Sequence, residues 1–364
     1  RLPPFFQGEP GLERSLFHWL MNSSKKSLAV DVETPEGAKI VRSLAERAHV
    51  LVQSGTLARL MSRTGLDFAS LHELNPSLVY TSITPFGLTG SLRDYAATDL
   101  TLLAMGGLLY LAGYPEGHPT AAYGYQAYHA GSLFGALGTL IAAYDAEATG
   151  EGQLVDVAIQ ECVAQALETA AQYYDLTGTV RTRVGTGQIE ASMGLYPCRD
   201  GLVYMAVGGL GARSWDGMLR WMEELGADTT PLRGEEWRDS DFRRRREAMD
   251  TFYEVFTSFT RRYDKDYLYE SGQEQGIAIC PVYTTEDVLH NAQLVARDFF
   301  VEVEHPELGA RFIYPGGPYR FQKSPWQIQR APLLGEHNYE ILVGELGYTR
   351  QQVEALTQGE VIAS

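Results

Sequence analysis

Short apolar runs alternate with helix-like segments in the first part of the chain. The runs at residues 28–32, 49–52 and 79–83 are rich in valine, leucine and isoleucine, which is typical of buried strands. Thr34-Pro35-Glu36 supplies a capping hydroxyl, a proline for the first helical position and an acid for the first turn, so we expect a helix to follow. A short helix is also expected over residues 68–74. Elements at this spacing predict an α/β fold with a parallel sheet.

Two longer apolar stretches come next, and both are expected to form buried helices. The first covers residues 100–111. The second covers residues 130–146 and has glycine at positions 131, 135 and 138, which share one helix face. We therefore expect another backbone to approach that face closely. After these stretches the pattern predicts a strand over 153–157 and a helix over 158–174. Near the end of the chain it predicts a helix over 349–356.

The pattern changes in the second half of the chain. Residues 177–192 are rich in glycine, threonine and arginine, which predicts a loop or linker. Residues 199–201 form a turn signal ahead of a strand over 202–207, and charged helices are expected over 214–271. Within them, the four arginines at 243–246 are predicted to form a solvated helix face; a ligand-binding cluster is the alternative.

Composition and charge narrow the classes of partner. Lysine and arginine number 30 against 46 aspartates and glutamates, for a net charge of −16. So negative a chain argues against nucleic acid or an anionic membrane as its main partner. Cys162, Cys198 and Cys280 lie far apart, which favours a reducing, cytoplasmic location over a disulfide framework. The chain starts with Arg1 rather than methionine, so we expect residues before it.

The common signatures of chemistry are absent from the sequence. There is no phosphate-binding GxxxxGK[ST] loop, no HExxH and no GxSxG, and the eight histidines have no metal-ligand spacing. The segment at 185–190 reads GxGxxE and lacks the last glycine of a dinucleotide fingerprint. Residue patterns alone therefore predict only an α/β protein with a second, mixed domain.

Several phrases, in order along the chain, resemble one family. The segment NPSLVYTSI at 75–83, TGEGQLVD at 149–156, GIAICPV at 276–282 and RAPLLGEH at 330–337 all match its motifs. The chain is therefore similar to the class III CoA-transferases, the group of formyl-CoA transferase, carnitine CoA-transferase and α-methylacyl-CoA racemase. Within that family, it resembles the heteromeric branch that acts on benzylsuccinate in anaerobic toluene degradation.

The resemblance implies a particular architecture. Members have a Rossmann-like large domain, a smaller α+β domain and long linkers, and two chains thread through each other as an interlocked dimer. The expected divisions are a large domain over 1–175, a linker over 176–191, a small domain over 192–305, and a linker with a returning C-terminal segment over 306–364. The first βα unit of the family is expected to be missing from residues 1–175.

The resemblance also implies a nucleophile, and here the sequence departs from the family. In the transferases an aspartate at the start of the small-residue helix attacks the acyl-CoA. Tyr128 stands at that position, and no Asp or Glu lies between Pro119 and Tyr144. A phenol has a pKa near 10 and yields an ester, which is a poorer acyl carrier than an anhydride. The racemase pair is missing too, because Thr98 replaces its histidine.

The positions that would contact CoA are altered as well. The family often has lysine where this chain has Glu33, and an acid there repels phosphate. The family's ENFRPG phrase is replaced by QSGTL at 53–57, in which Ser54 and Gly55 are the expected CoA contacts. Arg63, in the RTGL that follows at 63–66, is the candidate phosphate ligand. CoA or acyl-CoA is expected as substrate, without a covalently bound cofactor or a metal. The expected glycine loop comprises Gly185, Thr186, Gly187 and Gln188.

Three functions remain open at this point. The first is a non-catalytic subunit whose homologous partner carries the catalytic aspartate, acting on an acyl-CoA and a carboxylic acid. The second is a stand-alone isomerase, racemase or dehydratase of acyl-CoA that uses Tyr128 or His129. The third is a scaffold protein without acyl-CoA chemistry.

Overall fold

The computed structural model describes residues 1–54, 58–185, 189–207 and 212–363. The chain divides into two compact units. Unit 1 contains residues 1–102, 127–163 and 288–364, and unit 2 contains residues 103–126 and 164–287. Each unit is thus assembled from segments that are distant in the sequence.

A three-stranded parallel sheet forms the centre of unit 1, as the sequence predicts. Its order is β1 (Val50–Ser54), β2 (Val79–Thr84) and β3 (Leu154–Ala158). Val52 pairs with Thr81, and Ile83 pairs with Val157. The three predicted strands at these positions are therefore confirmed to within one or two residues at their ends.

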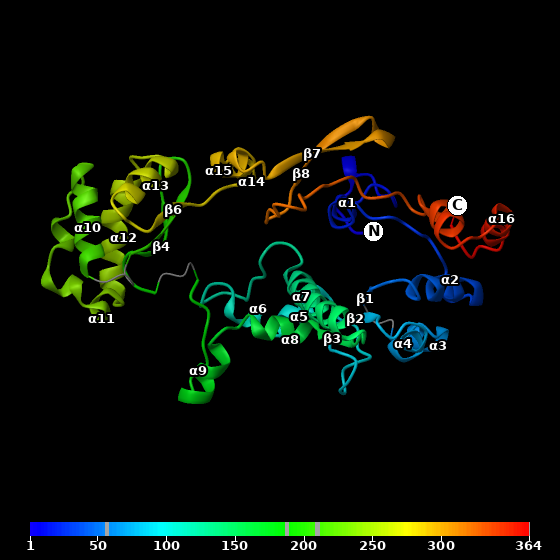
Figure 1. The fold of residues 1–364 in the computed structure, drawn as a ribbon. Helices are drawn as coiled ribbons and strands as arrows, with labels where there is room; N and C mark the ends of the chain where they lie inside the picture. The colour runs from blue at the N-terminus through cyan, green and yellow to red at the C-terminus, as the bar shows by residue number, and fades with distance from the viewer. Residues whose placement is uncertain (55–57, 186–188, 208–211, 364) are drawn as a thin grey trace. The chain divides into compact units, whose positions relative to one another are not determined.

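Helix α7 (Gln126–Thr149) packs its glycine face against this sheet (Figure 1). A Cβ atom on Gly131 would lie 2.8 Å from Ile159, and one on Gly135 would lie 2.6 Å from Ile83 Cδ1. The hydroxyls of Thr139 and Thr81 are hydrogen bonded at 2.6 Å across the same contact. The predicted close approach is confirmed, although side chains of the sheet and of the following helix occupy the space rather than a second backbone.

The predicted strand over 28–32 is wrong. Only one isolated bridge forms there, between Val30 and Ile362, and the segment is half-buried. The C-terminal tail satisfies its backbone: Asp31 N–H donates to Val361 at 2.8 Å, and Ala29 carbonyl accepts from Ala363 at 3.1 Å. A strand needs a neighbouring ladder along its length, and here a short, irregular tail takes that place.

The two helices predicted at 100–111 and 158–174, on either side of α7, are each broken. Residues 100–111 form α5 (Asp99–Met105) and α6 (Leu108–Leu111), separated by Gly107 with φ of +87°. Residues 158–174 become α8 (Ile159–Gln165) and α9 (Ala170–Thr177), separated where Glu168 has φ of +53°. The first stretch is also only partly buried, because Leu102 is inaccessible whereas Leu100 is exposed.

Helices with clear capping residues begin where the sequence predicts. In α2 (Pro35–Ala45), the Thr34 hydroxyl accepts from Gly37 N–H at 3.0 Å. The C-terminal helix α16 (Arg350–Gln358) begins with a capping box between Thr349 and Gln352. The other helices of unit 1 are α1 (Leu16–Met21), α3 (Ala58–Thr64), α4 (Phe68–Leu74), α14 (Thr285–Leu289, which spans the boundary), α15 (Ala292–Ala296) and the π-helical η6 (Glu340–Glu345).

A β-hairpin completes unit 1 and packs against its N-terminal helix. The hairpin consists of β7 (Phe300–His305) and β8 (Ala310–Pro315), with Val303 opposite Phe312. Trp19 of α1 contacts it, with its ring centroid 4.5 Å from that of His305. The hairpin therefore joins a segment near the start of the chain to one near its end.

Unit 2 is built around an antiparallel sheet and a cluster of helices (Figure 1). Its strands are β4 (Met193–Pro197), β5 (Leu202–Ala206) and β6 (Ile279–Pro281), and β5 confirms the strand predicted at 202–207. Aromatic rings fill its core, with Phe252 and Phe256 stacked at 5.3 Å. The longer helices around them are α10 (Ala212–Glu224), α12 (Arg246–Thr260) and α13 (Lys265–Glu274), and α11 (Ser240–Arg243) is short.

One of the four consecutive arginines is buried, contrary to the predicted solvated face. Arg243 is 4% exposed, and its Nε lies 3.6 Å from a carboxylate oxygen of Glu190, which is equally buried. Its Nη1 donates to the Trp237 carbonyl at 2.8 Å. Arg244, Arg245 and Arg246 are exposed, so the solvated face is confirmed for three of the four.

An acid-sensitive contact holds the segment that follows the hairpin. The Arg330 guanidinium, 2.6 Å from the Glu336 carboxylate, lowers the pKa of Glu336 to about 2. A glutamate in the unfolded chain has a pKa near 4.3, so the contact stabilises the fold above about pH 5 and is lost as pH falls toward about 2. Thermal unfolding of Glu336→Gln should therefore occur below that of the unmodified chain at pH 7, and the difference should shrink steadily toward pH 3. A difference independent of pH would contradict this.

Candidate functional site

Tyr128 lies in the first turn of α7, beside a buried carboxylate. Its backbone N–H donates to Asp99 Oδ1 at 3.1 Å, and Asp99 is 9% exposed. The carboxylate thereby satisfies one of the free N–H groups at the helix start and opposes the positive end of the helix dipole. Sequence reasoning missed this role for Asp99, because the hydrogen bond joins residues that are 29 positions apart in the sequence.

The side chain of Tyr128 is half-buried, and that of His129 is exposed. Consecutive residues on a helix point about 100° apart, so the two side chains do not share a face. The carboxylate that contacts the start of α7 is that of Asp99, and it is engaged by the helix backbone. The start of this helix thus carries a half-buried phenol and an exposed imidazole, and the Asp99 carboxylate is hydrogen bonded to its backbone.

Arg63, the candidate phosphate ligand, is already paired. Its Nη2 lies 2.7 Å from Glu33 Oε2, and both side chains are largely exposed, at 68% and 61%. Glu33 stands just before α2, whereas Arg63 lies in the last turn of α3. An incoming phosphate would therefore have to displace a carboxylate from the guanidinium.

Ser54 ends β1 at the carboxyl edge of the parallel sheet, where ligands commonly bind in α/β folds. Its side chain is exposed, and Gly55 lies outside the described residues. The neighbouring Gln53 is buried, donates to the hydroxyl of Ser82 in β2 and lines a pocket of about 320 Å³. Sequence reasoning missed Gln53, because its burial follows from a cross-strand contact.

Gly185 begins the expected glycine loop, and Thr186, Gly187 and Gln188 lie outside the described residues. Gly185 has φ of +65°, and its N–H donates to the Gly113 carbonyl at 3.0 Å. A Cβ at this position would lie 3.0 Å from the Tyr114 ring. Glycine is thus required here both by the backbone conformation and by the close contact.

Arg183 organises the segment against which Gly185 lies. Its guanidinium donates to the carbonyls of Tyr110 and Tyr114, each at 3.1 Å, and lies 3.4 Å from that of Gly117. One side chain thereby holds a turn of the chain by three of its carbonyl groups. Sequence reasoning missed Arg183, because nothing local to it marks these distant partners.

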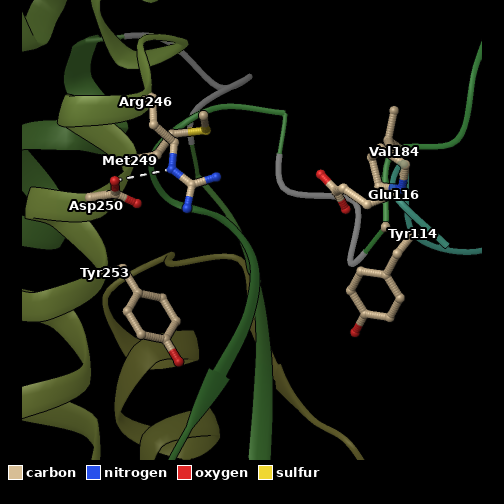
Figure 2. Close-up of a pocket in the computed structure, with 9 residues that line it drawn as sticks. Tyr114, Glu116, Val184, Arg246, Met249, Asp250 and Tyr253 are labelled. Carbon is tan, nitrogen blue, oxygen red and sulfur yellow. Dashed lines mark hydrogen bonds and ion pairs between the residues drawn. The ribbon is translucent and has the colours of Figure 1, made fainter.

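A pocket of about 360 Å³ adjoins Gly185 within unit 2 (Figure 2). Tyr114 and Glu116 lie on one side, and Arg246 and Tyr253 of α12 lie on the other. Arg246 is ion paired with Asp250 at 3.0 Å, as the dashed line in Figure 2 marks. Two phenol rings and side chains of both charges thus line this pocket.

The described residues hold no grouping of three or more histidines, cysteines, aspartates or glutamates that could bind a metal ion. Among these same residues, no helix has the length and apolar character that crossing a membrane requires. The structure brings Tyr128 together with Asp99, and Arg63 together with Glu33, in unit 1. Gly185 belongs to unit 2 and joins Tyr114.

Comparison with known proteins identifies relatives over nearly the whole chain. The profile of CoA-transferase family III matches residues 3–338. The chain is 41% identical to the succinyl-CoA:(R)-benzylsuccinate CoA-transferase subunit BbsE of Thauera aromatica, across 98% of this chain and 87% of that protein. It is 28% and 27% identical to the alpha and beta subunits of a succinyl-CoA–L-malate CoA-transferase of Chloroflexus aurantiacus, across 94% and 98% of this chain and 79% and 87% of theirs.

A solved structure supports the same assignment. A CAIB/BAIF family protein from Brucella suis superposes with a TM-score of 0.80 and 26% identity, across 94% of this chain and 87% of that one. The α/β fold expected from the sequence is therefore confirmed. Together with the profile match, this likeness means that the chain belongs to CoA-transferase family III.

Proposed function

We propose that this chain is the non-catalytic subunit of a heteromeric class III CoA-transferase. The observation that carries the proposal is Tyr128, which stands at the start of α7 where the family places its nucleophilic aspartate. The partner subunit, a homologue, would retain that aspartate and perform the transfer. BbsE and the malate enzyme's two proteins are subunits by name, which supports a partner for this chain.

The chemistry of the family explains why Tyr128 does not substitute for aspartate. In the transferases a carboxylate attacks the acyl thioester, releases CoA thiolate and forms a mixed anhydride that the thiolate or the acceptor acid can attack in turn. A tyrosine ester is far less reactive toward those nucleophiles. Asp99 is the carboxylate in contact with this helix start, but it is buried and accepts a hydrogen bond from the backbone of Tyr128.

The proposed architecture follows the family. Residues 1–175 would form a Rossmann-like large domain and residues 192–305 a small domain, connected by the linkers at 176–191 and 306–364. Two homologous chains would thread through each other as an interlocked dimer. The parallel order β1-β2-β3 supports the first of these assignments, and the antiparallel β4-β5-β6 supports the second.

The proposed reaction moves CoA from succinyl-CoA to an aromatic dicarboxylic acid of the benzylsuccinate type. The 41% identity to BbsE, which is by name a subunit of a succinyl-CoA:(R)-benzylsuccinate CoA-transferase, supports this choice. In this chain the described candidate contacts for CoA are Ser54 and Arg63, and Gly185 marks the start of the glycine loop. No covalently bound cofactor is needed, because acyl-CoA is itself the substrate.

Weak intrinsic binding of CoA should follow from the pairing of Arg63. We expect Glu33→Gln to tighten CoA binding about two- to fivefold at low salt, because exposed ion pairs are worth roughly 0.2–1 kcal/mol. Isothermal titration of the chain with CoA measures this. Glu36→Gln, an exposed acid in the first turn of the same α2, is the matched control and should have no effect. An equal gain from both variants would mean that Glu33 acts only through overall charge.

The test of the proposed function is the composition of the native complex. The chain should purify from its source, or from co-expression with neighbouring genes, in a 1:1 ratio with a homologue that carries the aspartate. CoA transfer by that complex should survive Tyr128→Phe within about twofold and be abolished by replacing the partner's aspartate. Transfer by this chain alone would refute the proposal.

A second candidate function has one supporting observation, the exposed imidazole of His129 beside Tyr128. It is a stand-alone acyl-CoA isomerase, racemase or dehydratase. Under that function a homodimer would turn over acyl-CoA, and Tyr128→Phe or His129→Gln would lower the rate at least a hundredfold. The same purified chain therefore distinguishes the two candidates.

A further inference from the structure

The pocket of about 320 Å³ beside Gln53 lies within unit 1, between the parallel sheet and the helices α3 and α4. Gln53 of β1 and Ser82 of β2 line it from the sheet, and Met61 of α3 and Phe68 of α4 line it from the helices. Its volume is at the lower end of the range for small-molecule sites, about 300–1,000 Å³. We call it the Gln53 pocket.

The Gln53 pocket contains a buried hydrogen-bond acceptor without a partner. Gln53 is 8% exposed, and its Nε2 donates to the hydroxyl of Ser82, which is itself inaccessible. The Oε1 of Gln53 has no hydrogen-bond partner among the described residues. Leaving such an oxygen unpaired destabilises a fold, so native proteins normally satisfy it with a ligand or a water. Gln53 therefore points to a molecule that donates a hydrogen bond in this pocket.

Most of the remaining wall of the pocket is apolar. Met61 is 9% exposed, and the rings of Phe68 and Tyr80 lie 6.2 Å apart at an angle of 70°. The Tyr80 hydroxyl already donates to the Leu66 carbonyl at 3.2 Å, so Tyr80 offers a ligand its ring. A single water needs only about 10–15 Å³, so one water satisfies Gln53 but leaves most of the pocket unfilled. A molecule with an apolar body and one donor matches both the oxygen and the wall.

The charge of the pocket excludes acids and phosphates. None of the described residues that line it is lysine, arginine or histidine, and its one charged side chain is that of Asp67. The Asp67 carboxylate accepts from the N–H of Ser70 at 3.2 Å and from its hydroxyl at 3.1 Å. An anion would be repelled by this carboxylate and by the Gln53 oxygen. A cation would lose its hydration to a site whose carboxylate is already hydrogen bonded.

We propose that the Gln53 pocket binds a small uncharged molecule that presents an N–H donor from an apolar body, with the N–H on Gln53 Oε1. Carboxamides are the simplest molecules of this class. The phosphates of CoA and the carboxylates of a dicarboxylic acid belong to the excluded class, so the pocket is a second site, separate from the CoA contacts Ser54 and Arg63. The proposal concerns unit 1 alone and does not rest on the proposed function.

Benzamide is the probe, titrated into the full chain and followed by saturation-transfer NMR. We expect a dissociation constant on the order of 1 mM for a molecule of so few atoms. Benzoate has the same ring with a carboxylate in place of the amide, and should bind about tenfold more weakly or worse. Gln53→Leu should weaken benzamide binding about tenfold through the loss of one hydrogen bond. Gln165→Leu, at an exposed glutamine of unit 2, is the matched control and should have no effect.

Two further variants keep the test decisive if Gln53→Leu fails to fold. Ala69→Trp, on an exposed residue that lines the pocket, should block benzamide and leave the circular dichroism unchanged. Gln53→Glu keeps the length of the side chain, and the hydroxyl of Ser82 can donate to the new carboxylate. It should reverse the selectivity, so that benzamidine binds about tenfold better than benzamide. A purely structural role for Gln53 would not change which probe binds.

Each outcome supports or overturns the proposal. Benzamide binding that is weakened by Gln53→Leu or Ala69→Trp and unchanged by saturating CoA supports it. No binding of benzamide, or equal binding of benzoate, overturns it, and the Gln53 oxygen would then hold only a water. Displacement of benzamide by CoA also overturns it, because the pocket would then be part of the CoA site. A chain that binds benzamide but assembles with no homologous subunit refutes the proposed function alone.

Discussion

Replacing Arg243 with methionine is expected to lower the free energy of unfolding by about 3–5 kcal/mol. The guanidinium faces Glu190, and each side chain is only 5% exposed. Methionine has a similar length but no charge, so the variant leaves the buried Glu190 carboxylate with only the exposed Arg244, 4.0 Å away, as an ion-pair partner. Removing one member of a buried pair costs far more than the pair itself contributes, because the remaining charge cannot be solvated.

The double variant Glu190→Gln/Arg243→Met separates that penalty from a simple loss of packing. It should recover most of the lost stability, since neither residue then carries a charge. Arg245→Met is the matched control and should change the free energy of unfolding by less than about 0.5 kcal/mol, because Arg245 is exposed. Urea unfolding of all four proteins measures these differences. Equal losses from Arg243→Met and Arg245→Met would contradict the argument.

Gly135→Val should destabilise unit 1 by about 3 kcal/mol, the upper part of the range for overpacking a core. The first carbon of any side chain would lie 2.6 Å from Ile83 Cδ1 and 3.2 Å from its Cγ1, so the Ile83 side chain, α7 or strand β2 would have to shift. Gly131, one turn earlier on the same face, is comparably close to Ile159, which limits how far α7 can shift.

A smaller side chain on the sheet opposite residue 135 should reduce this loss of stability. Adding Ile83→Ala to Gly135→Val should restore part of the lost stability, although Ile83→Ala alone destabilises the protein. Gly344→Ala is the control, because no atom lies within 4 Å of a Cβ at that glycine and its backbone conformation is ordinary. Thermal unfolding of the single and double variants provides the comparison, and simple additivity of the two changes would show that the residues do not compete for one space.

Local signals explain why much of the fold was predictable from the sequence. The start of α2 is determined by Thr34 and Pro35, which lie within the segment itself. The glycine spacing of α7 likewise reports a close approach, although it does not say which residue fills the space. Such predictions succeed because the residues that stabilise the element are its own neighbours in sequence.

The elements that were predicted wrongly depend on distant partners. The segment at 28–32 has the composition of a buried strand, but it pairs with residues 361–363, which no local pattern indicates. Arg243 resembles its three exposed neighbours in sequence and differs only because Glu190 lies beneath it. Burial of a charge by a residue more than fifty positions away is a property of the fold.

In the candidate site, too, the position of a residue was predictable from the sequence, whereas its contacts with distant residues were not. The position of Tyr128 could be read from the register of flanking motifs in the sequence. The contact of Asp99 with that residue's backbone, and the pairing of Glu33 with Arg63, could not. These contacts join α5 to α7, and the start of α2 to α3, so they appear only once the helices are placed.

The pairing of residues 29–31 with 361–363 has a consequence for synthesis. Unit 1 includes segments from both ends of the chain, so its last contacts cannot form until residues 361–363 have left the ribosome. Unit 2 lies between these segments and can complete its core earlier. Because contacts of such long sequence separation are slow to close, unit 1 should depend on chaperones during translation more than unit 2 does.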